Sequence, residues 1–232
     1  MRMQDKSIEP PSAHYADPVA GEKYFSWQRE GGAKGAIYNL KFFAPFIHED
    51  QDVLEFGCGG GYLLAALRCR EKIGVEVNPA ARAEAAKNGV QTLATLEEIS
   101  GKTFDRVISS HCLEHVANPY ESLCRLRQLL RNDGRLIMLL PIDDWRNQPW
   151  AAPDINAHLY TWTPQLLGNL LVASGFQPLT IKVVNHTFPP RFDARIWSFS
   201  RTMFGALAYV FSVALRRRQL WVEARVGDAV TR

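Results

Sequence analysis

Features that mark secreted, disulfide-rich and nucleic-acid-binding proteins are scarce in this sequence. Its four cysteines show neither Cys-x-x-Cys spacing nor the density of a disulfide framework, which favours a reducing compartment. A formal net charge of +3 over 232 residues is too small to argue for a nucleic-acid partner. The N-terminus has Asp5, Glu9 and three prolines where a secretion signal needs an apolar core. We therefore expect a cytoplasmic protein that binds no nucleic acid.

The stretch from Val53 to Leu67 predicts a strand, a tight turn and a helix. Val53–Phe56 is a short apolar run with the length of a buried strand, four glycines follow by residue 61, and leucines then recur at helical spacing. In this arrangement backbone N–H groups and a helix N-terminus face the polar end of a ligand. We expect a side chain at Gly57 or Gly59 to fill the space where the ligand must approach the backbone.

The spacing around the glycines separates this loop from two common phosphate-binding loops. Tyr62 stands where a dinucleotide fingerprint needs its third glycine, and no Gly-Lys-Ser/Thr follows, as a P-loop requires. Instead, Glu55 precedes the loop, and a second apolar run ends at Glu76, 21 residues after Glu55. A carboxylate at the tip of the second strand suits a bidentate bond to the two hydroxyls of a ribose.

With these features the chain resembles the class I S-adenosylmethionine-dependent methyltransferases, from about Tyr24 to Leu179. The motifs that carry the resemblance are Glu55-Phe-Gly-Cys-Gly-Gly-Gly61, Val75-Glu-Val-Asn78, Phe104-Asp-Arg-Val-Ile-Ser109, Leu113-Glu-His-Val116 and Asp133-Gly-Arg-Leu-Ile-Met138. The resemblance implies that S-adenosylmethionine is the cofactor. It would place the methionine end at Glu55 and the glycines, and the ribose at Glu76.

Further cofactor contacts follow from the same resemblance. The segment before the first strand would fold over the cofactor as a lid, with Tyr24 and Gln28 as candidates. Thr95 stands where the family sets an acid beside the adenine, and Leu96 would pack on the ring. The full set expected to bind the cofactor is Tyr24, Gln28, Glu55, Gly57, Cys58, Gly59, Glu76, Val77, Asn78, Thr95, Leu96, Ser110 and His111.

Strands that alternate with helices predict a mostly parallel sheet with helices on both faces. Together with the resemblance this gives one α/β domain, with a Rossmann-like seven-stranded sheet. Further strands are expected at Lys72–Val77, near Val90–Leu93, and at Phe104–Ser109, Arg135–Leu140, Leu179–Val184 and Leu220–Val226, and helices at Pro79–Asn88, Asn118–Leu130 and Pro164–Ala173. Residues 1–46 would form an N-terminal tail, poorly ordered up to Pro18, followed by a helical lid. Residues 47–187 would form the core. Residues 188–232 would form an apolar helical insertion and the final strand.

His111, Glu114 and His115 follow the fourth strand and are the candidate catalytic residues. They match the His-x-x-Glu-His string of a zinc protease, but that site needs the string on a helix, whereas here it begins at the end of a strand. His111 is our candidate general base, because its titration range suits the task; a hydrogen-bonding wall residue is the alternative. We expect no metal, although His111, Glu114, His115 and the distant His158 resemble a set that holds a divalent ion in some methyltransferases.

An apolar run from Thr202 to Leu215 precedes Arg216-Arg217-Arg218. Its 14 residues are too few to span a bilayer, which takes about 20 in a helix. Three interpretations stay open: a buried helix, a dimer face, or a peripheral contact of residues 196–218 with the inner membrane face. The last would fit a lipid-linked acceptor.

The leading hypothesis is a methyltransferase that acts on a hydroxyl, or less readily an amine, of a small molecule, sugar or lipid-linked acceptor. Asp143 to Trp145 and Phe188 to Trp197 would line the acceptor pocket. The alternative is a cofactor-binding or membrane-associated accessory protein without catalysis. Asn118-Pro-Tyr120 resembles a string of DNA-methylating enzymes, but it comes too late after the strand to grip a base. A monomer and a homodimer are both open.

Overall fold

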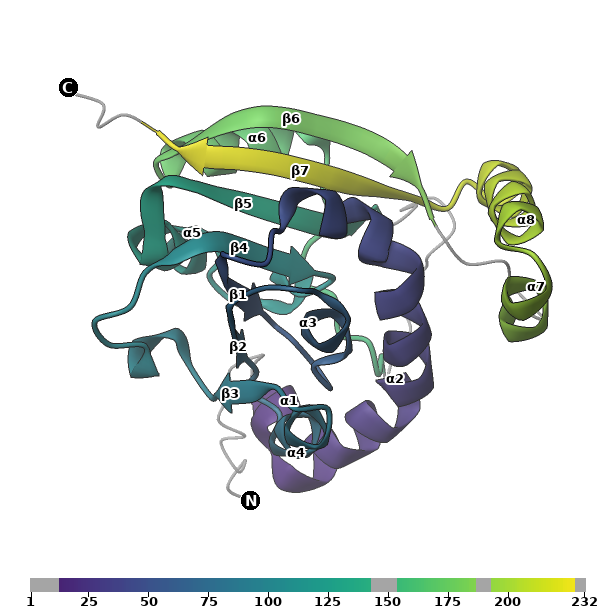
Figure 1. Cartoon of the computed structure of the whole chain (residues 1–232), viewed down its shortest axis with the longest axis horizontal. Helices are drawn as coiled ribbons and strands as arrows, with labels where there is room; N and C mark the ends of the chain where they lie inside the picture. The colour runs from purple at the N-terminus through teal and green to yellow at the C-terminus, as the bar shows by residue number, and fades with distance from the viewer. Residues whose placement is uncertain (1–12, 143–153, 187–192, 228–232) are drawn as a thin grey trace, which may run out of the picture.

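In the computed structural model, residues 13–142, 154–186 and 193–227 are described. They form a seven-stranded sheet with strand order β3-β2-β1-β4-β5-β7-β6 (Figure 1). The pairs among β1 to β5 are parallel, and β7 runs antiparallel to both β5 and β6. The expected α/β fold with a mostly parallel seven-stranded sheet is confirmed. The strands are β1 Asp52–Phe56, β2 Glu71–Val75, β3 Gln91–Leu93, β4 Phe104–Ser110, β5 Leu130–Ile142, β6 Phe176–Asn185 and β7 Arg218–Val226.

Helices cover both faces of the sheet, as the apolar character of its strands requires. They are α1 Ala13–Ala16, α2 Pro18–Asn39, α3 Tyr62–Ala66, α4 Pro79–Lys87, α5 Pro119–Leu129, α6 Pro164–Ala173, α7 Asp193–Phe199 and α8 Arg201–Ala214. Short 3₁₀ turns lie at η1 Leu40–Phe42, η2 Ala44–Phe46, η3 Leu96–Glu98 and η4 Leu113–His115. None of the helices within the described ranges has both the length and the apolar content needed to cross a membrane.

Two apolar cores lie on opposite faces of the sheet, because successive strand residues point to opposite sides. Leu54 and Val107 belong to the core on the side of α5 and α6. The same core contains Leu123 of α5 and Leu167 of α6. Val53 and Ile108, their chain neighbours, join the core that contains Leu63 and Leu64 of α3. The central strands are therefore buried on both sides, and their carboxyl ends are the part of the sheet left to form a site.

Several expected strand boundaries were wrong, most of all those of β5 and β6. β5 begins at Leu130 rather than at Arg135, with an irregular register against β4. β5 also continues past Pro141, which pairs with Gln219 of β7. Proline has no N–H to donate to a neighbouring strand, but β4 pairs with β5 only as far as Leu139, so no hydrogen bond between these two strands is lost at Pro141. β6 begins at Phe176, three residues before the expected start.

The N-terminal segment is ordered earlier than expected. Residues 13–16 form α1, within the segment that was expected to be poorly ordered, and the Tyr15 side chain is buried. Asp17 then caps α2 by accepting hydrogen bonds from the N–H groups of Val19 and Ala20, and Pro18 occupies the first helical position. α2 runs along the side of the molecule at which β4 ends (Figure 1), and Arg29 joins it to Glu84 of α4.

Candidate active site

A cavity of about 1040 Å³ lies at the carboxyl ends of the central strands. Cavities that hold small molecules measure about 300–1,000 Å³, so this one has room for a cofactor and a second ligand. The structure brings all the predicted site residues to it: Tyr24, Gln28, Glu55, Gly57, Cys58, Gly59, Glu76, Val77, Asn78, Thr95, Leu96, Ser110, His111, Glu114, His115 and His158 line its wall.

The two glycines Gly57 and Gly59 of the loop differ in what surrounds them. Gly57 and Gly59 have φ angles of 72° and 52°, which favour glycine. A Cβ atom on Gly57 would come within 2.2 Å of the Cys112 sulfur, whereas one on Gly59 would meet nothing within 4 Å. Only Gly59 therefore faces open space that a ligand could fill, as expected for both glycines. At Gly57 the space for a side chain is taken by Cys112.

The N–H groups of the loop are largely bonded within the protein, contrary to our expectation that they face the ligand. Gly57 and Cys58 both donate to the Val75 carbonyl, at 2.8 and 3.1 Å, and Gly61 donates to the Cys58 carbonyl. Gly59 donates to Oε2 of Glu76, at 2.8 Å. The loop thus contributes a bare, rigid surface to the cavity, and the bonds to Val75 fasten it to the end of β2.

Glu76 stands at the tip of β2 with both carboxylate oxygens directed to backbone donors. Oε2 accepts from Gly59 and Oε1 accepts from Asn78 at 2.9 Å. Burial raises the pKa of Glu76, and the N–H groups of Asn78 and Gly59 oppose that shift. A carboxylate has about four lone-pair positions, so each oxygen keeps capacity for a further donor such as a ribose hydroxyl.

Glu55 is almost fully buried at the end of β1. Its Oε2 has no hydrogen-bond partner among the described residues, and burial holds the pKa of the carboxyl well above its usual range. A buried carboxyl oxygen without a partner is costly, so this atom fits a ligand donor. An ammonium group there would supply both the donor and the opposite charge that lowers the pKa again.

Asn78 and Cys58 use their side chains inside the protein. Oδ1 of Asn78 accepts from Ala80 and Ala81 at the start of α4, and Nδ2 donates to the Gly21 carbonyl of α2 at 2.8 Å. The Cys58 sulfur donates to the Gly59 carbonyl, and burial raises the pKa of this thiol. Asn78 thus links α2 to Glu76, and any ligand contact of Cys58 would be made by its main chain.

The side of the cavity formed by α1 and α2 is aromatic. Tyr24 lies edge-on to Tyr15, with ring centroids 4.8 Å apart, and Gln28 lies one turn further along α2. Across the cavity, Leu96 is buried in η3, while Thr95 before it is exposed. An apolar side chain at this position can pack against the flat face of an aromatic ring. This agrees with the predicted role of Leu96, which is to pack on the adenine ring of the cofactor.

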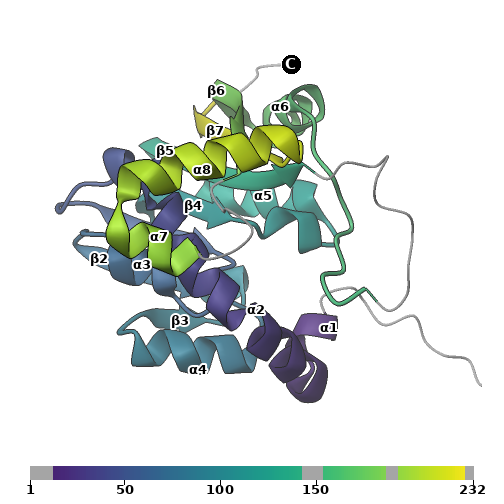
Figure 2. The ribbon, with the colours of Figure 1, turned by 90° about the vertical axis from the view of Figure 1, so that its right-hand side faces the viewer.

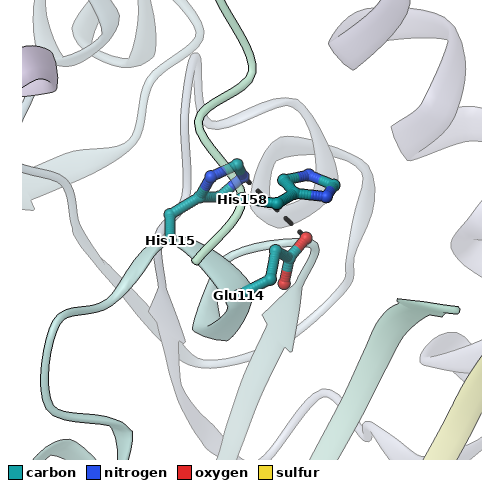
Figure 3. A group of neighbouring side chains, drawn as sticks. All are labelled: Glu114, His115 and His158. Atoms are coloured by element: carbon teal, nitrogen blue, oxygen red, sulfur yellow. Dashed lines mark ion pairs between the residues drawn. The ribbon is translucent and has the colours of Figure 1, made fainter. Parts of the chain in front are cut away.

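The candidate catalytic residues converge on the buried carboxylate of Glu114. His111 Nδ1 lies 3.8 Å from Glu114 Oε1, and His115 Nε2 lies 3.9 Å from the same atom. His158, 43 residues further along the chain, is held beside them because the N–H groups of Leu159 and Tyr160 donate to the Glu114 carbonyl. Figure 3 shows His158 and His115 on the same side of Glu114; one donor atom from each residue lies within 4.8 Å of the others.

Hydrogen bonds orient two of these imidazoles. The Tyr15 hydroxyl donates to the Asn156 carbonyl and lies 2.8 Å from Nδ1 of His115, so this ring presents Nε2 toward Glu114. Nε2 of His111 lies 3.1 Å from Oε1 of Gln219, so the proton of that ring belongs on Nε2 and its lone pair on Nδ1. Burial, with His158 nearby, lowers the pKa of His115 to about 4, so this ring is neutral near pH 7.

Backbone strain gathers at the same place. Among the described residues, the non-glycine positions with positive φ are His111, Ala157 and Arg216. His111 and Arg216 line the cavity, and Ala157 directly precedes His158. Such conformations cost about 1–3 kcal/mol each and cluster at functional sites, where the surrounding structure holds them in place.

Sequence reasoning missed several residues of the site. Tyr15 was given no role at the site, although its hydroxyl meets His115. Asn156 and His186 line the cavity, and Gln219 contacts His111 from behind it. These three carried no signal in the sequence, because long-range folding brings them there. Asp143 to Trp145 and residues 188–192, expected to line the acceptor pocket, lie outside the described ranges. The described remainder of that second segment, residues 193–197, does not line the cavity. Beyond the end of β4 the cavity is instead lined by Pro141, Ile142, His186 and Arg216 to Arg218.

Known structures share this architecture. The plantazolicin methyltransferase BpumL, solved in complex with SAH, superposes with a TM-score of 0.62 at 15% identity, covering 93% of each chain. An identity this low establishes the fold only. The fold, with a cavity at the carboxyl strand ends next to a glycine loop and an acidic β2 tip, is that of the class I S-adenosylmethionine-dependent methyltransferases.

Sequence comparisons agree. Residues 28–181 match the family described as Methyltransferase domain, and the chain belongs to this family, whose cofactor is S-adenosylmethionine. It is 34% identical over 114 residues to a Ubiquinone biosynthesis O-methyltransferase of Cereibacter sphaeroides, covering 44% of this chain and 46% of the relative. A protein of the same description from Dinoroseobacter shibae is 30% identical over 172 residues, covering 63% of this chain and 68% of the relative. The first match thus spans less than half of that relative's length.

Proposed function

We propose that this protein transfers the methyl group of S-adenosylmethionine to a hydroxyl group of a small-molecule, glycan or lipid-linked acceptor. One observation carries the proposal: the glycine loop, Glu76 and the His111–Glu114–His115 cluster line the same cavity. Methyl transfer from a sulfonium is an in-line displacement, so the protein mainly aligns the reactants and excludes water. A hydroxyl must also lose its proton, and imidazoles at the cavity wall can accept it.

Within this proposal, each end of the cofactor has its own partner. The ribose hydroxyls would donate to the remaining lone pairs of Glu76, and the ammonium group would donate to Oε2 of Glu55. The adenine would lie against Leu96. The methyl group would then point toward His111, at the end of β4, where the acceptor enters from the side of Ile142 and His186.

His111 is the proposed general base. Its lone pair is directed by the Nε2 contact to Gln219, and Glu114 lies on the Nδ1 side, where it would stabilise the imidazolium. His115 would orient the acceptor, since its ring is fixed by Tyr15. The relatives described as O-methyltransferases support a hydroxyl acceptor over an amine.

A second candidate mechanism uses a divalent cation held by Glu114, His115 and His158. The observation that favours it is the convergence of a buried carboxylate with imidazoles whose donor atoms lie within 4.8 Å of one another. Imidazole and carboxylate ligands suit zinc, manganese or iron, and such an ion would lower the pKa of a bound hydroxyl. Metal content of the purified protein, and calorimetric titration of Zn²⁺ and Mn²⁺ into the wild type and His158→Ala, would test it without any assay of activity.

The proposed reaction is tested in two stages. Calorimetry with S-adenosylmethionine establishes binding, and methyl-labelled cofactor is then supplied with a panel of phenols, catechols, sugars and amines. Labelled ethers support the proposal, and labelled amines overturn the hydroxyl assignment. Cofactor binding without a methylated product, also against a cell lysate, favours the non-catalytic accessory protein.

The proposed setting is the cytoplasm, in keeping with four free cysteines. Monomer and homodimer are distinguished by sedimentation.

A further inference from the structure

Helix α8 presents an apolar face to solvent, the reverse of what a surface helix normally shows. After Arg201, no charged residue occurs before Arg216. Phe204, Ala208 and Ser212 point inward, where Phe204 packs on Tyr38 of α2. The side chains on the outer side are nevertheless Met203, Tyr209, Val210 and Val213.

The apolar surface continues beyond both ends of the helix. Phe199, just before α8, is 82% exposed, and Leu215, just after it, is 56% exposed. Scattered apolar residues on a surface are ordinary, but a continuous apolar patch marks a place where something else binds. We call residues 199–215 with their outward side chains the α8 face. Figure 2 shows α8 lying across the outside of the molecule, in front of the sheet.

The charge around the α8 face has one sign. Residues 194–222 contain five arginines and no acidic residue. Three of the arginines, Arg216 to Arg218, are exposed and follow the helix directly. None of these three forms an ion pair with a carboxylate within the described ranges. In a symmetric dimer through this face, a second copy would set the same arginines against one another, whereas an anionic lipid surface would match them.

The same arginines reach the active site. Arg216, Arg217 and Arg218 line the cavity together with His111, so the basic end of the α8 face lies at the acceptor side. Aromatic and aliphatic side chains beside arginines are the composition of segments that lie in the headgroup layer of a membrane. A surface placed there would open the cavity toward the bilayer.

We propose that the α8 face docks on a membrane that contains anionic lipids, and that the acceptor enters the cavity from that membrane. The docking stands on the surface alone; the acceptor route rests on the proposed methyl transfer. The hydroxyl compound would then carry an apolar tail, with its reactive end reaching past Arg217 to His111.

Sedimentation of the purified full chain with lipid vesicles tests the docking directly. One set of vesicles is phosphatidylcholine alone, and the other also contains phosphatidylglycerol. We expect binding to the anionic vesicles that salt weakens, and at least about tenfold weaker binding to the neutral ones. Val210→Glu should reduce the binding at least about tenfold, because it places a buried negative charge in the contact.

Two matched variants guard against general effects. Val172, on α6, is 57% exposed, close to the 59% of Val210, so Val172→Glu introduces the same charge elsewhere. Arg217→Gln should also weaken the binding to anionic vesicles, because it removes one positive charge next to the face. Arg68 is exposed and does not line the cavity, so Arg68→Gln is its control. Both controls should bind anionic vesicles like the wild type, and all variants should retain the wild-type melting temperature.

Three results would overturn the docking: no vesicle binding by the wild type, equal loss in Val210→Glu and Val172→Glu, or a solution dimer that Val210→Glu dissociates. The last would assign the face to a second copy. Vesicle binding without methyl transfer would leave the docking in place and refute the proposed function. Methyl transfer that proceeds equally on water-soluble acceptors without vesicles would refute the acceptor route.

Discussion

The backbone N–H of Gly59 donates a 2.8 Å hydrogen bond to Oε2 of Glu76, and so joins the glycine loop to the tip of β2. The two elements that we assign to opposite ends of the cofactor are therefore parts of one rigid unit. Glu76 also accepts from the Asn78 N–H, and Asn78 in turn bonds to α2 through the Gly21 carbonyl. A change at Glu76 should consequently affect the glycine loop and α2 together.

Glu76→Ala should weaken S-adenosylmethionine binding about 10- to 100-fold, because it removes hydrogen bonds of a charged acceptor. Isothermal titration calorimetry measures the affinity. Glu71→Ala, at the other end of β2 and paired only with Lys102 among the described ion pairs, is the matched control and should leave the affinity unchanged. If Glu76→Ala binds like the wild type, the ribose assignment is wrong.

Gly57→Ala and Gly59→Ala should differ in kind. The new methyl group of Gly57→Ala meets the Cys112 sulfur at 2.2 Å, so crowding adds to the strain of positive φ, and we expect a loss of stability of about 2–5 kcal/mol. Gly59→Ala has open space and should lose only about 1–2 kcal/mol, but it should weaken cofactor binding. Urea unfolding and calorimetry separate the two effects.

The crowding at Gly57 has its own control. Cys112→Gly removes the atoms in contact, so the double variant Gly57→Ala/Cys112→Gly should be less destabilised than the sum of the two single variants. Strict additivity would show that the two residues do not interact.

Asp52 should stabilise the fold in a pH-dependent way. Hydrogen bonds from Arg70, with Arg131, lower the pKa of Asp52 from 3.8 to about 2. Because the pKa is depressed in the folded state, the stabilisation is present above about pH 4 and disappears as the pH falls to about 2. Asp52→Asn should therefore lower the free energy of unfolding by about 1–2 kcal/mol at pH 7, and by much less at pH 2.5. The effect at pH 7 is kept small because the arginines are partly exposed to solvent. A difference independent of pH between 7 and 2.5 would contradict the ion pair.

His111→Asn should lower kcat for methyl transfer about 10²- to 10⁴-fold while leaving the affinity for S-adenosylmethionine within about threefold. Asparagine tolerates the positive φ at this position, so the fold should survive the change. His48→Asn, at an exposed position far from the cavity, is the control. Full activity of His111→Asn would leave His111 as a wall residue and direct attention to His115.

Local patterns in the sequence were sufficient to predict the β-α units. The apolar runs at β1, β2 and β4 follow from short-range rules, and the structure confirms these strands. The helix ends obey short-range rules too: Asn118 caps α5, and Gly175, with a φ of 85°, follows the end of α6. The gathering of the site at the strand ends follows from the same rules, since parallel strands bring their carboxyl ends to one edge.

What failed depends on contacts between distant residues. Nothing near Tyr15 indicates that its hydroxyl meets Asn156, 141 residues away, so the sequence predicted no role for Tyr15 at the site. The partner of Gly57 is Cys112, which a glycine pattern cannot reveal. The continuation of β5 through Pro141 depends on where β4 stops pairing, and only the register shows that.

The position of β7 has a consequence for how the molecule assembles. β6 precedes β7 in the chain, yet its sheet partner in the described part of the molecule is β7, which fills the gap next to β5. β6 therefore has no strand to pair with until β7 has joined the sheet, and α7 and α8 lie between β6 and β7 in the chain. Closure of this edge is therefore a late event, and hydrogen exchange during refolding should protect β1 and β4 before β6.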